Sequence, residues 1–397
     1  MRLDEMKDRG RNSGAISPFF IGALIIFLSI YLAINYYVGL HFFQSVQSLI
    51  EPYSSFYWAA YALLAVSLIA AKLGRRLFPG RINDLVAITG DYWLAATYYS
   101  FLLWVVADIL HFLIDLIYPA KTTGYPSFYW GFGILSMVVI LLIYGTWNAR
   151  HPRVTHYDIT IKKTAYGLPK LHAVMVSDIH LGLVIDNDRL DEMVNSINGL
   201  NPDIVFLAGD TIDEDVKLFF TQKMPEVIGK LKSKFGVYAV LGNHEYIGGN
   251  SELATDYLRQ AGVIVLIDEY IKVNNQFYVV GRDERMAGYM TGKQRLDLSR
   301  VMDGIDHSLP IILLDHQPHN LEEGQRNEVD LQLSGHTHNG QFFPNNLFAK
   351  HIFEHSWGYL RRGEYQVIVS AGYGTWGPPI RIGNYSEIID LNISFAK

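Results

Sequence analysis

The sequence predicts a two-part fold, with a membrane region of four helices over residues 1–150 and an α/β domain over residues 151–397. The first part contains four long apolar runs, whereas the second contains short apolar runs that end in glycine or polar residues. Residues 1–150 hold 10 Lys and Arg against 8 Asp and Glu, a charge near +2, and the remainder is near −8. A nearly neutral apolar region therefore precedes an acidic one.

The composition of the 397 residues excludes several classes of protein. With 33 Lys and Arg, 39 Asp and Glu and a net charge of −6, the chain is no general polycation, so we expect no nucleic-acid partner. The chain has no cysteine, which excludes disulfides, thiolate metal sites and thiol nucleophiles. His, Asp, Glu and Asn remain as candidate metal ligands.

Each apolar run of the first part approaches the roughly 20 residues that a helix needs to cross a bilayer. Tyr and Trp cluster near the ends of the runs, as in interfacial belts. Four successive runs do not fit a signal peptide, and a buried soluble helical core is the alternative. The shortest run is the second. The runs are Ser17–Leu40, Phe56–Leu73, Asp91–Tyr118 and Tyr125–Trp147.

Basic residues alternate between the connections and predict the orientation. They precede the first run, lie between the second and third, and follow the fourth, while the other two connections hold one Lys between them. The expected location is therefore the inner (plasma) membrane, multi-pass, with both termini and the α/β domain in the cytoplasm. This assignment requires the second run to span. The residues are Arg2, Lys7, Arg9, Arg11, Lys72, Arg75, Arg76, Arg81, Lys121, Arg150, Arg153, Lys162 and Lys163.

Three ionisable residues of the third run share one helix face: Asp108, His111 and Asp115, at i, i+3 and i+7. At membrane depth such groups suggest a relay or a headgroup contact. The alternative, which we favour, places Asp115, and with it His111, at the outer interface of the membrane.

Short apolar runs of the second part predict buried strands separated by helices, for example Arg189–Leu200 and Leu218–Ser233. This alternation indicates a layered α/β fold, and the stretch from Tyr365 to Ile393 is more purely β. The predicted strands are Ala173–Ser177, Ile204–Ala208, Val237–Leu241, Phe277–Val280, Ile311–Leu314, Leu331–Ser334 and Val367–Ser370.

Five of these strands are followed at once by potential metal ligands. Ligand sites form at the carboxyl ends of strands in α/β sheets, and glycine before three of the residues permits close backbone approach. Oxygen and imidazole ligands without sulfur suit Mn, Fe or Zn, and so many ligands indicate two divalent metal ions. The residues are Asp178, His180, Asp210, Asn243, His244, His316, His336 and His338.

The ordered set resembles the calcineurin-like metallophosphoesterases over roughly residues 170–390. Gly340-Gln341-Phe342 and the Gly374–Pro379 segment make it most similar to the membrane-associated bacterial branch. The resemblance is carried by Asp178-Ile-His180, Gly209-Asp210, Gly242-Asn243-His244-Glu245, His316 and Gly335-His336-Thr337-His338.

The resemblance implies a β-sandwich flanked by helices and a division of roles. One metal would be held by Asp178, His180 and His338. The other would be held by Asn243, His316 and His336. Asp210 would bridge the two, while His244 would act in catalysis, stabilising the transition state or protonating the leaving oxygen. Mn²⁺ is the preferred metal, with Zn²⁺ or Fe as alternatives.

Other residues are candidates for supporting roles. Asp213, Glu245 and Asp315 could orient ligand imidazoles, or they could be solvated residues and helix caps.

Arg361 and Arg381, together with Arg362, are candidates for binding substrate phosphate. The glycine-rich Gly372–Gly377 permits approach of a ligand, or forms a tight turn.

The segment 340–365 carries more apolar residues than a solvated loop needs. It either completes the core, which we favour, or forms an apolar rim that dips into the bilayer.

These features predict a membrane-anchored phosphoesterase that hydrolyses a phosphodiester or pyrophosphate by attack of a hydroxide bridging two metals. The expected partners are a phosphorylated, amphipathic or lipid-linked substrate and membrane lipids. The alternatives are a phosphoesterase of soluble nucleotides or phosphoproteins, and a non-enzymatic sensor or scaffold with a structural metal site. A transporter would need more polar residues within the helices.

Overall fold

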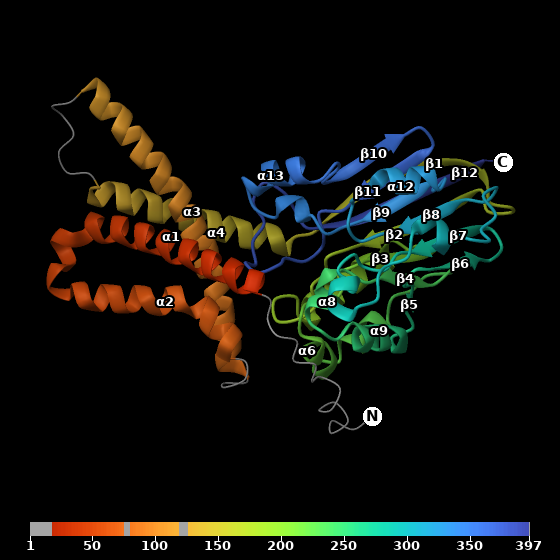
Figure 1. The fold of residues 1–397 in the computed structure, drawn as a ribbon, viewed down its shortest axis with the longest axis horizontal. Helices are drawn as coiled ribbons and strands as arrows, with labels where there is room; N and C mark the ends of the chain where they lie inside the picture. Colours follow the sequence, from red (N-terminus) through yellow and green to blue (C-terminus); the bar gives the residue numbers. More distant parts are fainter. Residues whose placement is uncertain (1–17, 75–79, 119–125, 397) are drawn as a thin grey trace. The chain divides into compact units, whose positions relative to one another are not determined.

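The computed structural model describes residues 18–74, 80–118 and 126–396 (Figure 1). The chain divides into two compact units, Met1–Ile140 and Leu141–Lys397. Several basic residues used for the predicted orientation, among them Arg2, Arg75 and Lys121, lie outside the described residues.

The first unit is helical. It contains α1 (Pro18–Ile50), the short 3₁₀ helix η1 (Glu51–Tyr53), α2 (Ser54–Gly74), α3 (Arg81–Ile117) and the first part of α4 (Phe128–Arg150). Within the described residues, three helical stretches are long and apolar enough to cross a membrane. The first of them, Leu24–Lys72, runs through α1, η1 and α2, so the count of four spans stays a prediction.

The surface of these helices is apolar. Only 17–22% of the residues in the three apolar windows are buried within the protein. Large side chains such as Phe27, Leu63, Ile109 and Phe132 are exposed. A helix of a soluble core would bury such residues, so this pattern disfavours the soluble alternative.

The ionisable residues of α3 have partners. His41 Nε2 of α1 lies 3.2 Å from Asp108 Oδ1, and the Tyr37 hydroxyl donates to the other carboxylate oxygen. His111 Nε2 lies 3.5 Å from Asp115 Oδ2 on the same helix. Asp108 therefore ties α3 to α1, and a relay or headgroup role for these groups stays a prediction.

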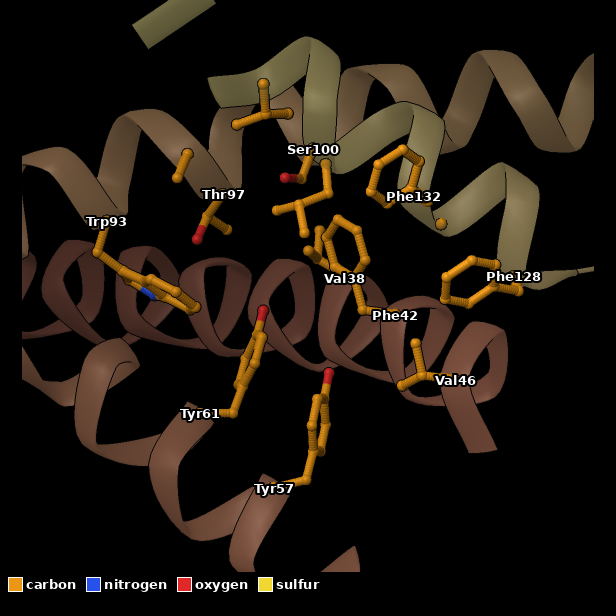
Figure 2. Close-up of a pocket in the computed structure, with 14 residues that line it drawn as sticks. Val38, Phe42, Val46, Tyr57, Tyr61, Trp93, Thr97, Ser100, Phe128 and Phe132 are labelled. Carbon is orange, nitrogen blue, oxygen red and sulfur yellow. The ribbon is translucent and has the colours of Figure 1, made fainter. Parts of the chain in front are cut away.

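A pocket between the helices of this unit is lined mainly by apolar and aromatic side chains (Figure 2). Tyr57 and Tyr61 enter it from α2, and their hydroxyls donate to the α1 carbonyls of Gly39 and Asn35 at 2.8 and 2.9 Å. These bonds fix one wall of the pocket to α1.

The second unit is built around two six-stranded sheets, with strand orders β1-β12-β2-β3-β4-β5 and β10-β11-β9-β8-β7-β6. β2, β3, β4 and β5 run parallel to one another, as do β7, β8, β9 and β11. The strands are β1 (Arg153–Thr164), β2 (Lys170–Val176), β3 (Ile204–Ala208), β4 (Val237–Val240), β5 (Ile264–Val265), β6 (Glu269–Val273), β7 (Phe277–Gly281), β8 (Ile311–Leu314), β9 (Leu331–Ser334), β10 (Gly358–Arg362), β11 (Tyr365–Val369) and β12 (Glu387–Ala396).

Three apolar clusters hold these layers together. The central cluster takes residues from both sheets, for example Phe206 of β3 and Ile312 of β8. A second cluster joins the first sheet to α5, α6, α7 and α9, and a third joins the second sheet to α11 and α12. The helices are α5 (Asn187–Gly199), α6 (Val216–Thr221), α7 (Met224–Ile228), α8 (Asn243–Ile247), α9 (Ser251–Gln260), α10 (Ala287–Thr291), α11 (Leu298–Val301), α12 (Leu321–Arg326), η2 (His338–Gly340) and α13 (Asn345–Ile352).

Three of the predicted strands match the structure without offset and the other four within three residues at each end, because buried runs of β-branched and aliphatic residues are a strong local signal. The segment of helical character predicted over Leu218–Ser233 does contain helix, but not as a single element. It is divided into α6 and α7, because Lys223 adopts a left-handed conformation with φ 57° and Pro225 follows it.

The last turns of α4 belong to the second unit and pack closely against its loop 380–386. Asn148 Nδ2 donates to the carbonyls of Arg381 and Asn384, at 3.0 and 2.6 Å, and Arg381 N donates to Gly145 O at 2.9 Å. A Cβ on Gly145 would lie 2.9 Å from Ile380 Cβ, which is too close. The boundary between the two compact units lies at residues 140–141, about ten residues before the boundary at 150 in the sequence analysis.

Glu387, at the start of β12, is fully buried and organises the loop that follows β11. Its Oε1 accepts from Ala371 N at 2.6 Å and from Trp357 Nε1 at 3.0 Å, and its Oε2 accepts from Thr155 Oγ1 at 2.9 Å.

We expect Glu387→Ala to lower the free energy of unfolding by about 2–4 kcal/mol, because it leaves several buried donors unpaired. Glu387→Gln should cost less, since its amide oxygen still accepts. Urea unfolding followed by tryptophan fluorescence measures both, and the exposed Glu364→Ala serves as a control without effect. Equal stability of Glu387→Ala and the control would contradict the expectation.

Candidate metal centre

Five strands deliver the candidate ligands to one edge of the second unit. Asp178 follows β2, Asp210 follows β3, Asn243 follows β4, His316 follows β8 and His336 follows β9. The strands are parallel within each sheet, so their carboxyl ends meet on the same side. All are buried except His336, which is partly buried.

The backbone at this edge is bent inward. Left-handed conformations, with φ between 48° and 72°, occur at Asp178, His180, Asp210, His336 and His338. Such conformations cost energy for residues other than glycine and concentrate at functional sites. They turn the side chains toward one another instead of continuing the strands.

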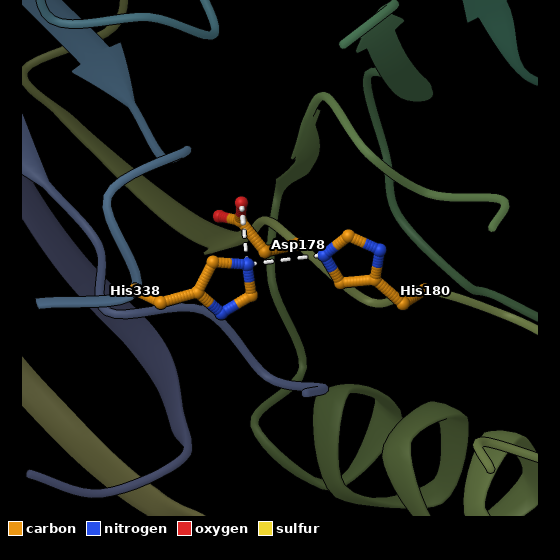
Figure 3. A group of neighbouring side chains, drawn as sticks. All are labelled: Asp178, His180 and His338. Atoms are coloured by element: carbon orange, nitrogen blue, oxygen red, sulfur yellow. Dashed lines mark hydrogen bonds and ion pairs between the residues drawn. The ribbon is translucent and has the colours of Figure 1, made fainter. Parts of the chain in front are cut away.

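The first group of ligands consists of Asp178, His180 and His338 (Figure 3). His338 Nε2 lies 3.1 Å from His180 Nε2 and 3.4 Å from Asp178 Oδ1. Two imidazole nitrogens and a carboxylate oxygen this close together have the arrangement of ligands around a single cation.

The second group consists of Asp210, His316 and His336. His316 Nε2 lies 3.1 Å from Asp210 Oδ2, and His336 Nδ1 lies 2.7 Å from Asn243 Oδ1. All four side chains of the predicted second site, including Asn243, are therefore neighbours.

Backbone hydrogen bonds connect the two groups. His336 N donates to both Asp178 oxygens, at 2.9 and 3.0 Å, and His244 N donates to Asp210 Oδ1 at 2.8 Å. A Cβ on Gly242 would collide with the Asp210 carboxylate, and one on Gly335 with the Asp178 carboxylate. Glycine before these ligands thus allows two chain segments to approach closely.

His244 lies beside the first group with a carboxylate behind it. Its Nδ1 lies 3.0 Å from Asp213 Oδ1, and its ring centroid lies 4.5 Å from that of His180. The ring of Trp376 meets the His244 ring edge-on, with 6.0 Å between the two ring centroids. Burial alone would lower the pKa of His244, but Asp213 and Asp210 raise it to about 9.

The pKa values of two ligand imidazoles suit metal binding. Burial lowers the pKa of His180 to about 4 and that of His336 to about 3, so both imidazoles are neutral at pH 7, as ligands must be. Burial alone would also lower the pKa of His316, but Asp210 raises it well above its ordinary value. Burial alone would raise the pKa of Asp210, but the adjacent His316 holds it well below its ordinary value.

The donor set fits a pair of divalent cations. Among the described residues, His316 Nε2 and His180 Nδ1 are buried without a hydrogen bond, although His316 Nε2 is close to Asp210. An orphaned nitrogen aimed at a carboxylate is expected where a cation completes the site. Carboxylate, amide and imidazole donors without sulfur suit Mn, Fe or Zn.

The three candidate orienting residues have different partners. Asp213 contacts His244 and lies 3.9 Å from His180 Nδ1, as expected for an orienting carboxylate. Asp315 instead forms a two-point ion pair with Arg295, at 2.9 and 2.5 Å. Glu245 accepts from Ile212 N and Gly242 N, so it holds the loops together.

Arg381 is fully buried, so its position does not favour contact with substrate. Its Nη2 donates to the carbonyls of Ala371, Gly372 and Gly374, at 2.7, 3.1 and 2.7 Å. The same nitrogen lies 3.4 Å from His338 Nδ1. These contacts indicate that Arg381 positions the loop after β11 and supports a ligand.

Arg361, on β10, is exposed. Its Nε donates to Gly363 O at 2.8 Å, and its guanidinium lies 3.9 Å from Glu364. Arg362 pairs with Glu354. The described contacts of these arginines include none of the candidate ligands.

The interpretation of segment 340–365 as core is wrong for four of its apolar residues. Phe343, Leu347, Phe348 and Ile352 are exposed, because α13 lies on the surface with only Ala349 buried.

Sequence reasoning missed several residues that shape the centre. Ala208 O accepts from His316 Nδ1 at 2.8 Å, and Asn384 Nδ2 donates to the carbonyls of His338 and Asn339. Ser177 Oγ donates to Asp178 Oδ2 at 2.5 Å. A serine directly before the first aspartate was a visible signal, whereas Asn384 is brought in from 46 residues beyond His338.

Comparisons with known proteins agree with this geometry. Residues 171–340 match the family model described as calcineurin-like phosphoesterase. A transmembrane protein with metallophosphoesterase domain from Danio rerio is 33% identical over 278 residues, 66% of this chain and 63% of that protein. The chain thus spans under two thirds of the length of this relative.

Two further similarities were found. An uncharacterized metallophosphoesterase from Aquifex aeolicus is 34% identical over 264 residues, which are 65% of this chain and 97% of that protein. A solved dimetal phosphatase from Danio rerio has a TM-score of 0.37 at 13% identity, covering 58% of this chain and 100% of that one.

Asp210→Asn should reduce the metal content of the purified protein, because it removes the carboxylate charge beside His316 while preserving the side-chain shape. We expect about two Mn²⁺ per chain in the unchanged protein after loading and at most about one in the variant. Elemental analysis after gel filtration measures the content. Asp191→Asn, which breaks an exposed ion pair, is the matched control, and equal metal content in both variants would contradict the assignment.

Proposed function

The chain belongs to the calcineurin-like metallophosphoesterases and is a metal-dependent phosphoesterase; from this premise we propose that it is a membrane-anchored enzyme that hydrolyses a phosphodiester or pyrophosphate in an amphipathic or lipid-linked substrate. The observation that carries the proposal is the convergence of the ligand side chains from five strand ends on one edge of the two sheets.

The proposed division of ligands follows the two groups. Asp178, His180 and His338 would hold one cation, and His316, His336 and Asn243 the other, with Asp210 serving both. Such a pair of cations supplies charge neutralisation at the phosphoryl group and acidification of water. Mn²⁺ is the proposed metal, because the donors are oxygen and nitrogen with one amide.

His244 is the proposed catalytic residue. Its Nδ1 is held by Asp213, so the other ring nitrogen is available to interact with a substrate oxygen. A histidine oriented in this way can stabilise the charge on the phosphoryl group or donate a proton to the leaving oxygen.

The proposal of a lipid-linked substrate rests on two features of the chain. Helices apolar enough to span a membrane precede the catalytic unit, and exposed apolar side chains of α13 lie close in sequence to the ligands His336 and His338. An enzyme tethered in this way meets membrane substrates at high local concentration. Soluble nucleotides and phosphoproteins are the second candidate class.

The proposed topology has four spans, with both termini and the catalytic unit in the cytoplasm and the protein in the inner (plasma) membrane. It rests on the alternation of basic residues in the connections. A sensor or scaffold with only a structural metal site is disfavoured by the complete ligand set.

The purified protein should release p-nitrophenol from bis(p-nitrophenyl) phosphate only with a divalent metal such as Mn²⁺. Asp210→Ala or His336→Ala should abolish the reaction, because each removes a ligand. His244→Ala should lower turnover by about 10²–10⁴-fold while metal content is retained, as expected for loss of a proton donor.

Asp191→Asn is again the control, and its turnover should equal that of the unchanged protein. Activity that survives full chelation, or either ligand substitution, would contradict the enzymatic proposal.

The substrate class is tested by a turnover screen of the detergent-solubilised protein with Mn²⁺. We expect lipid pyrophosphates and lipid-linked phosphodiesters to be cleaved with higher kcat/KM than nucleotides with the same scissile bond, because the apolar part adds binding energy. Equal kcat/KM for both classes would remove the support for a lipid-linked substrate.

A further inference from the structure

An exposed apolar surface lies beside the metal centre. We name it the apolar rim and define it by Leu347, Phe348 and Ile352 of α13 together with Trp376 of the loop after β11. Phe348 is 63% exposed, Ile352 67% and Trp376 57%. Contiguous exposed apolar side chains mark interaction sites in soluble domains, and three of the four share α13.

α13 is amphipathic. With 3.6 residues per turn, its three rim residues fall within one arc of about 140° on the helix surface. Ala349 is buried on the opposite side, and the last turn carries Lys350 and His351. Lys350 falls about 60° outside this arc, whereas His351 falls within it. An apolar helix face with a lysine at its border is typical of helices that lie in the interfacial layer of a bilayer.

The two parts of the rim are bound to each other. Gln341 Nε2 donates to the carbonyls of Trp376 and Pro378, both at 3.0 Å, and Trp376 N donates to Gln341 Oε1 at 2.9 Å. Through this buried residue, the segment that leads into α13 is held to the Trp376 loop. Trp376 also contacts His244, so the rim borders the metal centre.

The same surface is tied to the end of α4. Phe343 N donates to Ile382 O at 2.7 Å, and a Cβ on Gly145 would lie 3.0 Å from Ile382 Cγ1. Arg381 N donates to Gly145 O, and Asn148 donates to Arg381 O. The final turns of a helix able to span a membrane are thus held against the loop that supports the rim.

We propose that the apolar rim docks the catalytic unit on the lipid bilayer, with Leu347, Phe348, Ile352 and Trp376 in the headgroup and upper acyl region. The occupant is the bilayer because the chain enters the catalytic unit from a candidate membrane span at this same surface. The rim is aromatic and aliphatic with Lys350 beside it, a composition found in helices that lie at a bilayer interface.

Docking would bring His244 and the ligands beside it close to the membrane surface, since the His244 and Trp376 rings are in contact. This inference goes beyond the proposed reaction: it concerns where the unit sits, and it can be tested without any turnover.

The cysteine-free chain allows the test with single-cysteine variants of the full-length protein. Phe348→Cys places a label on the rim. Tyr166→Cys is the matched control: Tyr166 is 68% exposed and precedes β2, at the strand end opposite Asp178. Each variant is labelled with an environment-sensitive nitrobenzoxadiazole dye and reconstituted at one protomer per nanodisc, with and without phosphatidylcholine carrying doxyl quenchers.

We expect at least about twofold more doxyl quenching at position 348 than at position 166, because interfacial helices bury their apolar face about 5–10 Å deep. Equal quenching at the two positions would overturn the proposal. So would quenching at position 348 that appears only when a lipid-linked substrate is added, or shielding of the label only at higher protomer loading, which would indicate a second copy.

A second variant keeps the test independent of one label. Leu347→Ser, Phe348→Ser and Ile352→Ser combined should reduce quenching of a dye at Trp376→Cys by about twofold or more, since the docked face is lost. Turnover of bis(p-nitrophenyl) phosphate by the triple variant, without the cysteine, should stay unchanged and shows that the metal centre is intact. Unchanged quenching in an active triple variant would contradict docking through α13.

Discussion

The burial of acidic and imidazole side chains at one sheet edge is the constraint on which the catalytic unit depends. Charged groups removed from water are costly unless other groups compensate them. Here backbone donors such as His336 N and His244 N compensate the buried carboxylates. The His316 imidazole beside Asp210 contributes as well. The left-handed backbone at Asp178 and Asp210, and the glycines before Asn243 and His336, are the local cost of that arrangement.

A second buried charge connects the metal centre to the rest of the unit. The Arg381 guanidinium is satisfied by carbonyls of the loop after β11, and it lies beside His338. Its backbone bonds with Gly145 and Asn148 continue this connection to the end of α4. A planar group with five donors holds several carbonyls at once, which a lysine cannot do. The metal ligand His338 and the end of α4 are thus connected through Arg381.

The unit therefore combines a polar, buried centre with an apolar, exposed border. Trp376 belongs to both, because its ring contacts His244 while most of its surface faces outward. If the proposed amphipathic substrate is correct, such a border would separate its two ends: the phosphate would enter the polar centre, and the apolar part would stay in lipid.

The sequence by itself determined seven of the twelve strands and the polar residues that follow five of them. Apolar runs and the residues that follow them are local features, so Asp178, Asp210, Asn243, His316 and His336 could be assigned to strand ends without a structure. Only the tertiary structure decided that Arg381 is buried, that Asp315 pairs with Arg295, and that α13 exposes its apolar face. The physical reason is that exposure and pairing depend on segments far apart in the chain. An arginine or phenylalanine carries the same local signal whether it meets solvent, a carbonyl or another layer of the fold.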